Sequence, residues 1–439
     1  MLASWLRSSD STRPSNRRRF LTKRRIRTYP VIAAVVLVAV ALVETVSSPR
    51  PWWTVWGADF RAFYTAGFFV RTGHADRLYD VASQLSFQGQ ALGGDGEVSL
   101  WLSPPFVAWL FVPLSLLSFP AALVLHTAVS VGAAAAAFFL LGRELGRPTP
   151  AAMAWASITY YPTLQCLSEG QLSALSLLLL ASFFVVLRRG HDAAAGALLG
   201  CLAFKPQLAL GLVAALLGAR RFRALASAFG VAIACAAISY GTLPAATRDY
   251  IARAPHLGTL LREPGYPTAG LHGLFQVSTL LLDAFSPRAA TVLGVTLTLV
   301  AIGALVALWV RRPWAPGSPD WDRRMAASFA LAVITSPHLF GYDLMLLLLP
   351  FVVVWHVYRD GTDGRPFDAG PLLAATALVW ALALMGPALT VAQQTLTRWA
   401  FGRSFALQLG VVAVAGWAWL IAPPRPLRAL LRRGSSRSE

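Results

Sequence analysis

The sequence alternates long apolar runs with short clusters of arginine, and this alternation limits its fold more than any other feature. Apolar residues make up 56% of the 439 residues and charged residues only 13%, whereas soluble proteins usually carry about 25% charged residues. These proportions exclude a disordered chain, a secreted disulfide scaffold and an ordinary cytosolic enzyme. The fold class that remains is an all-α, polytopic membrane protein.

The arginine clusters predict how the chain is oriented in the membrane. Nine basic side chains precede the apolar run at 31–43, and the positive-inside rule places this flank in the cytoplasm. If every later cluster is also cytoplasmic, the apolar runs pair between clusters and give about 10–12 transmembrane helices. This placement accounts for the net charge of +18 without a nucleic-acid partner. We therefore expect a multi-pass protein of the cytoplasmic (inner) membrane with both termini in the cytoplasm.

This topology predicts one membrane domain between two basic tails. Most of the polar sequence falls in two long extracytoplasmic segments, so chemistry that uses polar side chains is expected to face the periplasm or the exterior. The predicted parts are the tail 1–29, the transmembrane domain 30–422 with extracytoplasmic loops 49–103 and 242–272, and the tail 423–439.

The apolar stretch 104–141 is long enough for two membrane spans. Two spans would place Arg143 outside the cytoplasm, against the positive-inside rule. We therefore expect a membrane-surface helix over 104–119 and a single span over 121–141.

The first outer segment is predicted to contain two amphipathic helices. Apolar side chains at positions 60, 63, 64, 67 and 68 share one helical face, and a second helix is predicted to begin at Asp76. Helices of this kind lie in the membrane interface rather than across the bilayer.

Asp59 stands at the start of the first of these helices. One interpretation is an N-cap, in which the carboxylate accepts backbone N–H groups at the helix start. The other is a catalytic base held at the lipid–water boundary. Local sequence alone favours the cap.

Several short motifs, in their order along 57–350, resemble those of the GT-C class of glycosyltransferases. More narrowly, the chain resembles glycosyltransferase family 87, typified by polyprenyl-phosphate-mannose-dependent α-1,2-mannosyltransferases. The resemblance implies a GT-C fold and transfer of a hexose, most often mannose, from a polyprenyl phosphate to a glycolipid or polysaccharide acceptor. The motifs are GADFRAFYTAG, LYD, SPPF with PLSLL, SEGQLSALSLLLL, FKPQLAL and SPHLFGYDLMLLLLP.

The resemblance assigns the role of general base to Asp59, because the class uses the acidic residue of its first outer loop in this way. One base that activates an acceptor hydroxyl opposite the leaving phosphate suits single displacement with inversion. The class often shows an acidic pair here, whereas Ala58 precedes Asp59 in this chain. We therefore predict no metal site from adjacent carboxylates. Besides the lipid-linked donor the sequence indicates no cofactor, and use of a divalent metal stays open.

Lys205 is the predicted contact for the donor phosphate. It is one of only two lysines in the chain and lies between two apolar half-spans, where a lysine costs several kcal/mol unless it is paired or hydrated. Pro206 breaks the helix beside it, and Gln207 is predicted to hydrogen-bond a sugar hydroxyl. The alternative interpretation is a lysine whose side chain extends to the interface.

The polar turns SPHLFGYD and SEGQ supply further candidates. His338 is able to donate to phosphate or to act on the acceptor near neutral pH, while Asp343 is interpreted as a helix cap. Gln171 and Glu169 are turn residues by default and sugar contacts by resemblance.

Neighbours of Asp59 complete the predicted site. Tyr64 and Arg61 are expected to line the pocket because they lie close to Asp59 in sequence. Arg262 and His272, in or just after the second outer segment, are weaker candidates for a phosphate contact.

Two other functions remain compatible with the sequence. A transporter or flippase for a lipid-linked or small solute usually shows pseudo-symmetric halves and polar residues at the bilayer midplane, whereas the polar residues here gather at the outer ends of the spans. A non-catalytic scaffold for wall synthesis is the third hypothesis. In every case the lipid bilayer is a partner of the chain.

Overall fold

The computed structural model describes residues 23–48, 51–92, 99–146, 150–253, 270–359 and 369–422, and these residues are overwhelmingly helical. Their only β-type pairing is an isolated bridge between Leu271 and Phe340. Among these residues, four helices are long and apolar enough to cross a membrane, and six shorter apolar helices accompany them. The prediction of an all-α, polytopic membrane protein is confirmed. The C-terminal tail, most of the N-terminal tail and Arg262 lie outside the described residues.

The helices follow one another closely along the chain, with 3-10 helices labelled η. The first group is α2 (Lys23–Ser47), α3 (Trp52–Val55), α4 (Phe60–Arg71), η1 (Ala75–Arg77), α5 (Val81–Leu92), η2 (Pro105–Val107), α6 (Ala108–Phe111), η3 (Leu114–Leu116), α7 (Phe119–Leu145), α8 (Pro150–Thr159), α9 (Tyr161–Glu169) and α10 (Ser173–Arg188). The second group is α11 (Asp192–Gly200), η4 (Cys201–Phe204), η5 (Pro206–Leu208), α12 (Leu210–Gly218), α13 (Phe222–Thr242), α14 (Pro244–Arg253), α16 (Leu274–Leu282), α17 (Pro287–Ala307), α18 (Pro319–Thr335), η8 (Gly341–Leu347), α19 (Leu348–Arg359), α20 (Ala369–Phe401) and α21 (Leu409–Ile421).

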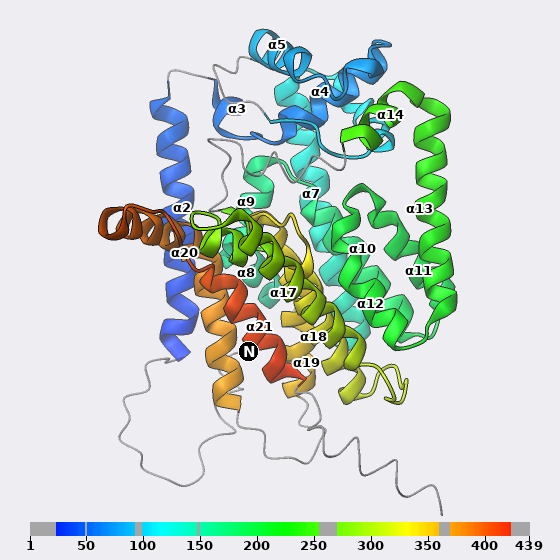
Figure 1. The fold of residues 1–439 in the computed structure, drawn as a ribbon, viewed down its shortest axis with the longest axis vertical. Coiled ribbons are helices and arrows are strands. Elements are labelled where there is room, and N and C mark those ends of the chain that lie inside the picture. The colour runs from blue at the N-terminus through cyan, green and yellow to red at the C-terminus, as the bar shows by residue number, and fades with distance from the viewer. Residues whose placement is uncertain are drawn as a thin grey trace, which may run out of the picture.

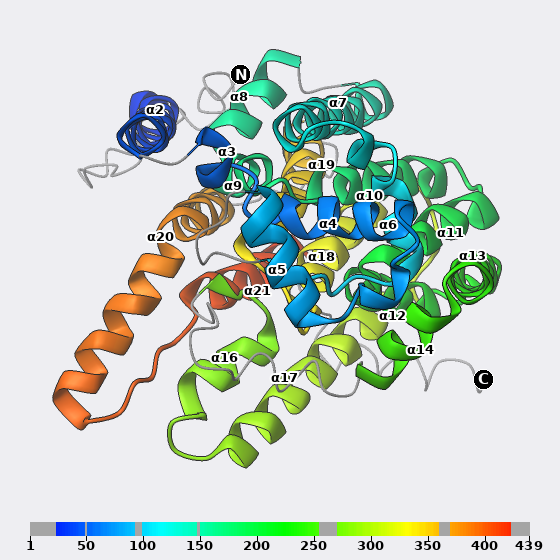
Figure 2. The same ribbon diagram turned by 90° about the horizontal axis from the view of Figure 1, so that it is seen from above.

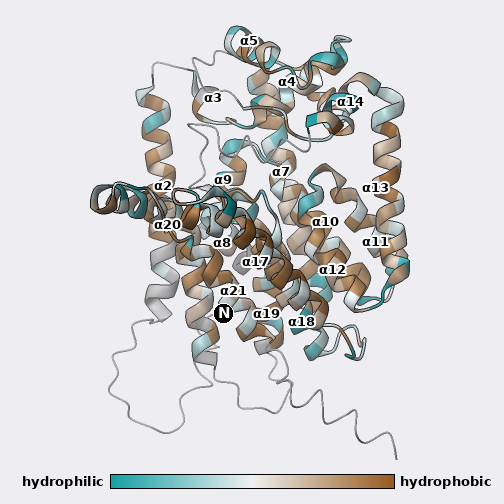
Figure 3. Cartoon of the chain, viewed as in Figure 1, coloured by the Kyte–Doolittle hydropathy of each residue, from teal (hydrophilic) through white to brown (hydrophobic). Residues whose placement is uncertain are grey.

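The membrane helices stand side by side beneath a layer of short helices (Figure 1). Viewed from above, α4, α5 and α6 lie across the bundle, over the region of α10 and α18 (Figure 2). Apolar residues run along the spanning helices, whereas hydrophilic residues are frequent in the covering layer (Figure 3). The core is centred on α10 and α18, in which most side chains are buried.

The covering layer differs in two respects from the predicted surface helices. The helix α4 forms as expected, but Arg61 and Thr65, which lie off its apolar stripe, are each 1% exposed because neighbouring segments enclose the helix on several sides. The second helix begins at Val81 rather than at Asp76. Its start is fixed by Asp80, whose Oδ2 accepts the backbone N–H of Ser83 at 2.9 Å, an N-terminal capping bond.

The segment before α7 follows the expected pattern of a short surface region and one span. Three short helical pieces, η2, α6 and η3, lead into α7, which is a single helix of 27 residues. This segment is tied to α13, because the backbone N–H of Phe106 donates to Ser239 Oγ at 3.0 Å. As expected, one helix long enough to span a membrane begins at residue 119, whereas three short pieces stand where a single helix over 104–119 was predicted.

Two half-spans meet at Lys205. The helix α11 tightens into η4, and Pro206, which has no N–H to donate, prevents a continuous helix into α12. Small residues let α11 approach α13 closely: a Cβ on Gly200 would lie 2.5 Å from the carbonyl oxygen of Ala228. The half-spans place Lys205 at the end of a hairpin beside α13, which continues past them to α14 (Figure 1).

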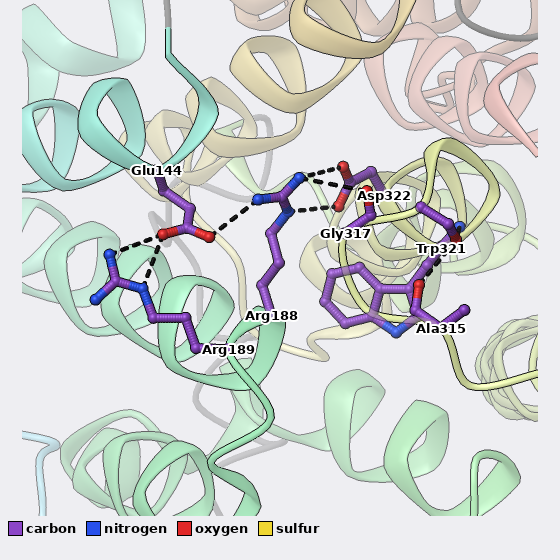
Figure 4. A network of polar contacts seen from close by, with 8 residues as sticks. Glu144, Arg188, Arg189, Ala315, Gly317, Trp321 and Asp322 are labelled. Carbon is purple, nitrogen blue, oxygen red and sulfur yellow. Dashed lines mark hydrogen bonds and ion pairs between the residues drawn. The ribbon is translucent and has the colours of Figure 1, made fainter.

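The opposite end of the bundle is joined by ion pairs. Arg188 at the end of α10 donates from Nη1 to Glu144 of α7 at 2.9 Å and from Nε to Asp322 of α18 at 3.1 Å. Arg189 binds the other oxygen of Glu144. Figure 4 shows Arg188 lying between the two carboxylates. This network fixes three helices at the end where their arginines gather.

Arg188→Met is expected to lower the free energy of unfolding by about 3 kcal/mol, because it leaves the buried Asp322 carboxylate without its cation. The measurement is the thermal unfolding midpoint of the purified protein in detergent. Arg189→Met is the matched control, since Arg189 is 53% exposed and exposed pairs contribute only about 0–1 kcal/mol. Equal midpoints for the two variants would contradict this assignment.

Candidate active site

The first outer loop docks on the SEGQ turn through its backbone. The N–H of Gly57 donates to the carbonyl of Ser168 at 2.6 Å, and the N–H of Asp59 donates to the carbonyl of Glu169 at 3.0 Å. Gly170 closes the turn with φ of 71°, and a Cβ there would lie 2.6 Å from Cβ of Phe60. Glycine therefore meets both the left-handed backbone and the close approach. These contacts bring Asp59 against the turn.

The Asp59 carboxylate faces this turn rather than its own helix. Its side chain makes no capping hydrogen bond to α4. Instead, Oδ2 accepts Nε2 of Gln171 at 2.5 Å and Oδ1 accepts the hydroxyl of Ser99 at 3.1 Å. The N-cap interpretation is therefore wrong, and the half-buried carboxylate is held by two donors from outside its helix.

Ser99 is itself held by the second helix of the covering layer. Nε2 of Gln88 donates to the carbonyl of Ser99 at 2.8 Å, and Oε1 of Gln88 accepts the N–H of Ser99 at 3.1 Å. The same helix fixes the next segment, because Gln84 accepts the N–H of Trp101 at 2.7 Å. The buried amides of α5 thus set the position of a direct partner of Asp59.

Gln171 connects Asp59 to Lys205. Its Oε1 accepts Nζ of Lys205 at 3.4 Å, while its Nε2 donates to Asp59. The ammonium of Lys205 also pairs with Oδ1 of Asp343 at 2.8 Å and lies 4.9 Å from the ring centre of Tyr342. One amide therefore separates the carboxylate of the first loop from the lysine of the half-span hairpin.

Asp343 belongs to this network and is not a helix cap. Besides Lys205, its Oδ1 accepts the hydroxyl of Ser173 at 2.5 Å, and the N-cap position of η8 is occupied by Phe340. Ser173 begins α10, the helix whose other end carries Arg188.

His338 lies beside the same charges. Its ring packs edge-on against Phe340 at 5.1 Å between centroids. Burial lowers the pKa of His338 to about 4, while Asp343 raises this pKa and Lys205 lowers it. The imidazole is therefore neutral near pH 7 and is suited to hydrogen bonding rather than to carrying charge.

The remaining predicted residues occupy other positions. The hydroxyl of Tyr64 donates to the carbonyl of Leu117 at 2.7 Å and so ties α4 to the segment before α7. Arg61 is enclosed within the covering layer. Gln207 is half-buried, and its side chain makes no hydrogen bond with the described residues. His272 is buried; its backbone N–H donates to the carbonyl of Leu339 at 2.7 Å, and its Nδ1 lies 2.8 Å from the carbonyl of Gly270.

Two further residues adjoin the site. Glu169, a turn residue by default and a sugar contact by resemblance, has a carboxyl that interacts with Asp59. His126 of α7 was assigned no role, yet its ring stacks on Phe60 at 4.7 Å. A single histidine within an apolar span is a weak indication of a functional site. The acidic residue of the SEGQ turn is a stronger indication.

The arrangement combines one carboxylate that can accept a proton with a cation and several hydrogen-bond donors. Within the described ranges, no three His, Cys, Asp or Glu side chains gather as a metal ion would require. A carboxylate beside a cation and hydrogen-bond donors is suited to removing a proton from a hydroxyl group next to a bound anionic group.

The model of glycosyltransferase family 87 matches residues 101–337, a stretch that contains Gln171 and Lys205 and stops just before His338. Neither a curated protein nor a solved structure matches the chain.

Proposed function

The chain belongs to glycosyltransferase family 87 and is a membrane glycosyltransferase, and from this premise we propose that it transfers a hexose from a polyprenyl-phosphate donor. Mannose is the proposed sugar, and a glycolipid or polysaccharide is the proposed acceptor. The observation that carries the proposal is the single amide of Gln171, which joins Asp59 to Lys205. Base and cation are thereby available to one substrate.

In the proposed reaction Asp59 accepts the proton of the acceptor hydroxyl. The acceptor oxygen bonds to the anomeric carbon as the bond from that carbon to the phosphate oxygen breaks, with inversion. Lys205 stabilises the departing phosphate, and His338 is placed beside Lys205 to donate a hydrogen bond. Asp343 pairs with Lys205 in the substrate-free chain, so the donor phosphate competes with this carboxylate.

The position of the arginines supports a site on the outer face. The helix α10 begins at Ser173 beside Asp343 and ends at Arg188, where arginines from several helices gather. By the positive-inside rule the arginine end is cytoplasmic. We therefore place Asp59 at the periplasmic or exterior side of the cytoplasmic membrane.

Reconstitution in proteoliposomes tests the proposal. With radiolabelled polyprenyl-phosphate mannose as donor and an octyl mannoside as acceptor, we expect an elongated glycoside of inverted anomeric configuration and free polyprenyl phosphate. Asp76→Asn, which changes an exposed carboxylate of the same loop, serves as a control and should behave as the wild type. Solute counterflow without any sugar product would instead identify a transporter.

A further inference from the structure

The sequence places only one acidic residue at the start of α4, but the fold supplies a second carboxyl from a distant segment. Glu169 closes α9, and its backbone carbonyl accepts the N–H of Asp59 at 3.0 Å. Its Oε1 accepts Nε2 of Gln165 at 2.8 Å, and its carboxyl is near enough to that of Asp59 for the two to interact. The backbone contact thus brings the two carboxyls into one neighbourhood.

A hydrogen bond between two carboxyl groups requires a proton on one of them, because two carboxylates have no donor to share. The surroundings decide which group carries it. Asp59 accepts from Gln171 and Ser99, whereas Glu169 has a single amide donor in Gln165. More donors stabilise the ionised form, so the charge belongs on Asp59 and the proton on Glu169.

The electrostatic surroundings of Glu169 agree with this assignment. Burial raises the pKa of Glu169, and the negative charges of Asp59 and Asp343 raise it further. The other titratable group on its own helix that acts with it is Tyr161. Lys205, which donates to Gln171, is already paired with Asp343. From α7, His126 stacks on Phe60.

We propose that Asp59 and Glu169 form a proton-sharing pair, in which protonated Glu169 positions the ionised Asp59 as the base. This inference rests on the proposed function of Asp59. During transfer the acceptor proton moves to Asp59, the new bond to the anomeric carbon forms, and the electron pair of the broken bond leaves with polyprenyl phosphate. The pair then holds two protons and no net charge beside the departing phosphate, and it resets by releasing one proton to water.

The pair predicts a characteristic pH dependence. When Glu169 loses its proton at higher pH, two adjacent carboxylates remain where the anionic donor has to bind. The kcat/KM of the wild type is therefore expected to fall on the alkaline side. Glu169→Gln keeps a donor toward Asp59 but has no proton to lose. Whatever its rate at neutral pH, this variant should show an alkaline fall moved upward by about one pH unit or more.

An infrared titration of the purified protein tests the pairing without any activity. We expect a protonated-carboxyl band at neutral pH that is absent from Glu169→Gln. In Asp59→Asn the same band should titrate at lower pH by about one unit or more, since the neighbouring negative charge is gone. Asp76→Asn, at an exposed position of the same loop, is the matched control and should leave the band unchanged.

Several outcomes would overturn the pair. If the infrared band titrates at the same pH in Asp59→Asn as in the wild type, the two carboxyls do not share a proton. Equal loss of activity at every pH in Glu169→Gln, with an unmoved alkaline limb, would indicate a structural role. Activity that disappears with a chelator, returns with Mg²⁺ and is absent from Glu169→Gln at every pH would indicate metal ligands. A wild type without sugar transfer contradicts the proposed function alone, because the infrared titration still decides the pairing.

Discussion

Asp59→Asn is expected to lower the rate of sugar transfer by about 10³-fold, within the range that general bases contribute. Asparagine has nearly the same shape: its side-chain oxygen can still accept Nε2 of Gln171, and its amide nitrogen can donate to the hydroxyl of Ser99. It has no basic site for the acceptor proton. The loss should therefore appear in kcat, with little change in the thermal unfolding midpoint.

The control for this variant is Asp76→Asn, which alters an exposed acid of the same loop and should leave transfer unchanged. Initial rates with the polyprenyl-phosphate donor measure both variants. If Asp59→Asn keeps a tenth or more of the wild-type transfer rate, Asp59 is not the general base. Loss of folded protein would be visible separately as a lower unfolding midpoint.

Lys205→Met is the second variant for which we expect a large effect, and it acts on two properties. It removes the proposed phosphate contact, which should lower kcat/KM by about 10²-fold or more, as for other donors at developing charge. It also leaves Asp343, 3% exposed, without its cation, at an expected cost of about 3 kcal/mol in unfolding free energy.

Removing both partners separates these two effects. The double variant Lys205→Met, Asp343→Asn has no unpaired buried charge, so its unfolding midpoint should recover most of the loss. Its sugar transfer should stay low, because the phosphate still lacks a cation. Recovery of transfer together with stability would mean that Lys205 serves only to neutralise Asp343.

Much of the architecture could be predicted because membrane spans leave strong compositional signals. The arginine clusters and apolar runs gave a surface region and one span before residue 145, and a turn between half-spans at Lys205. The covering layer was harder to predict. The helical spacing of α4 indicated one buried face, but sequence patterning does not reveal what covers the other face, and so the burial of Arg61 and Thr65 was not expected.

The candidate site was predictable as a set of residues but not as a network. Lys205 was predicted because a lysine between apolar half-spans is costly, and Gln171 was predicted from the family resemblance. The hydrogen-bond partners of these two residues could not be predicted. Asp59 and Asp343 could each be explained as a helix cap, an interpretation that needs only neighbouring residues. The bonds actually formed join Asp59 to Gln171 and Lys205 to Asp343, pairs that are more than 100 residues apart.

The helix α10 connects the two polar ends of the molecule, with Ser173 beside Asp343 and Arg188 between Glu144 and Asp322. Since both ends are anchored, one residue inserted or deleted within it would turn one end by about 100° and shift it by about 1.5 Å relative to the other. Substitutions along its apolar surface keep this spacing. Selection on α10 should therefore preserve its length more strictly than its composition, because its length sets the distance and rotation between its two anchored ends.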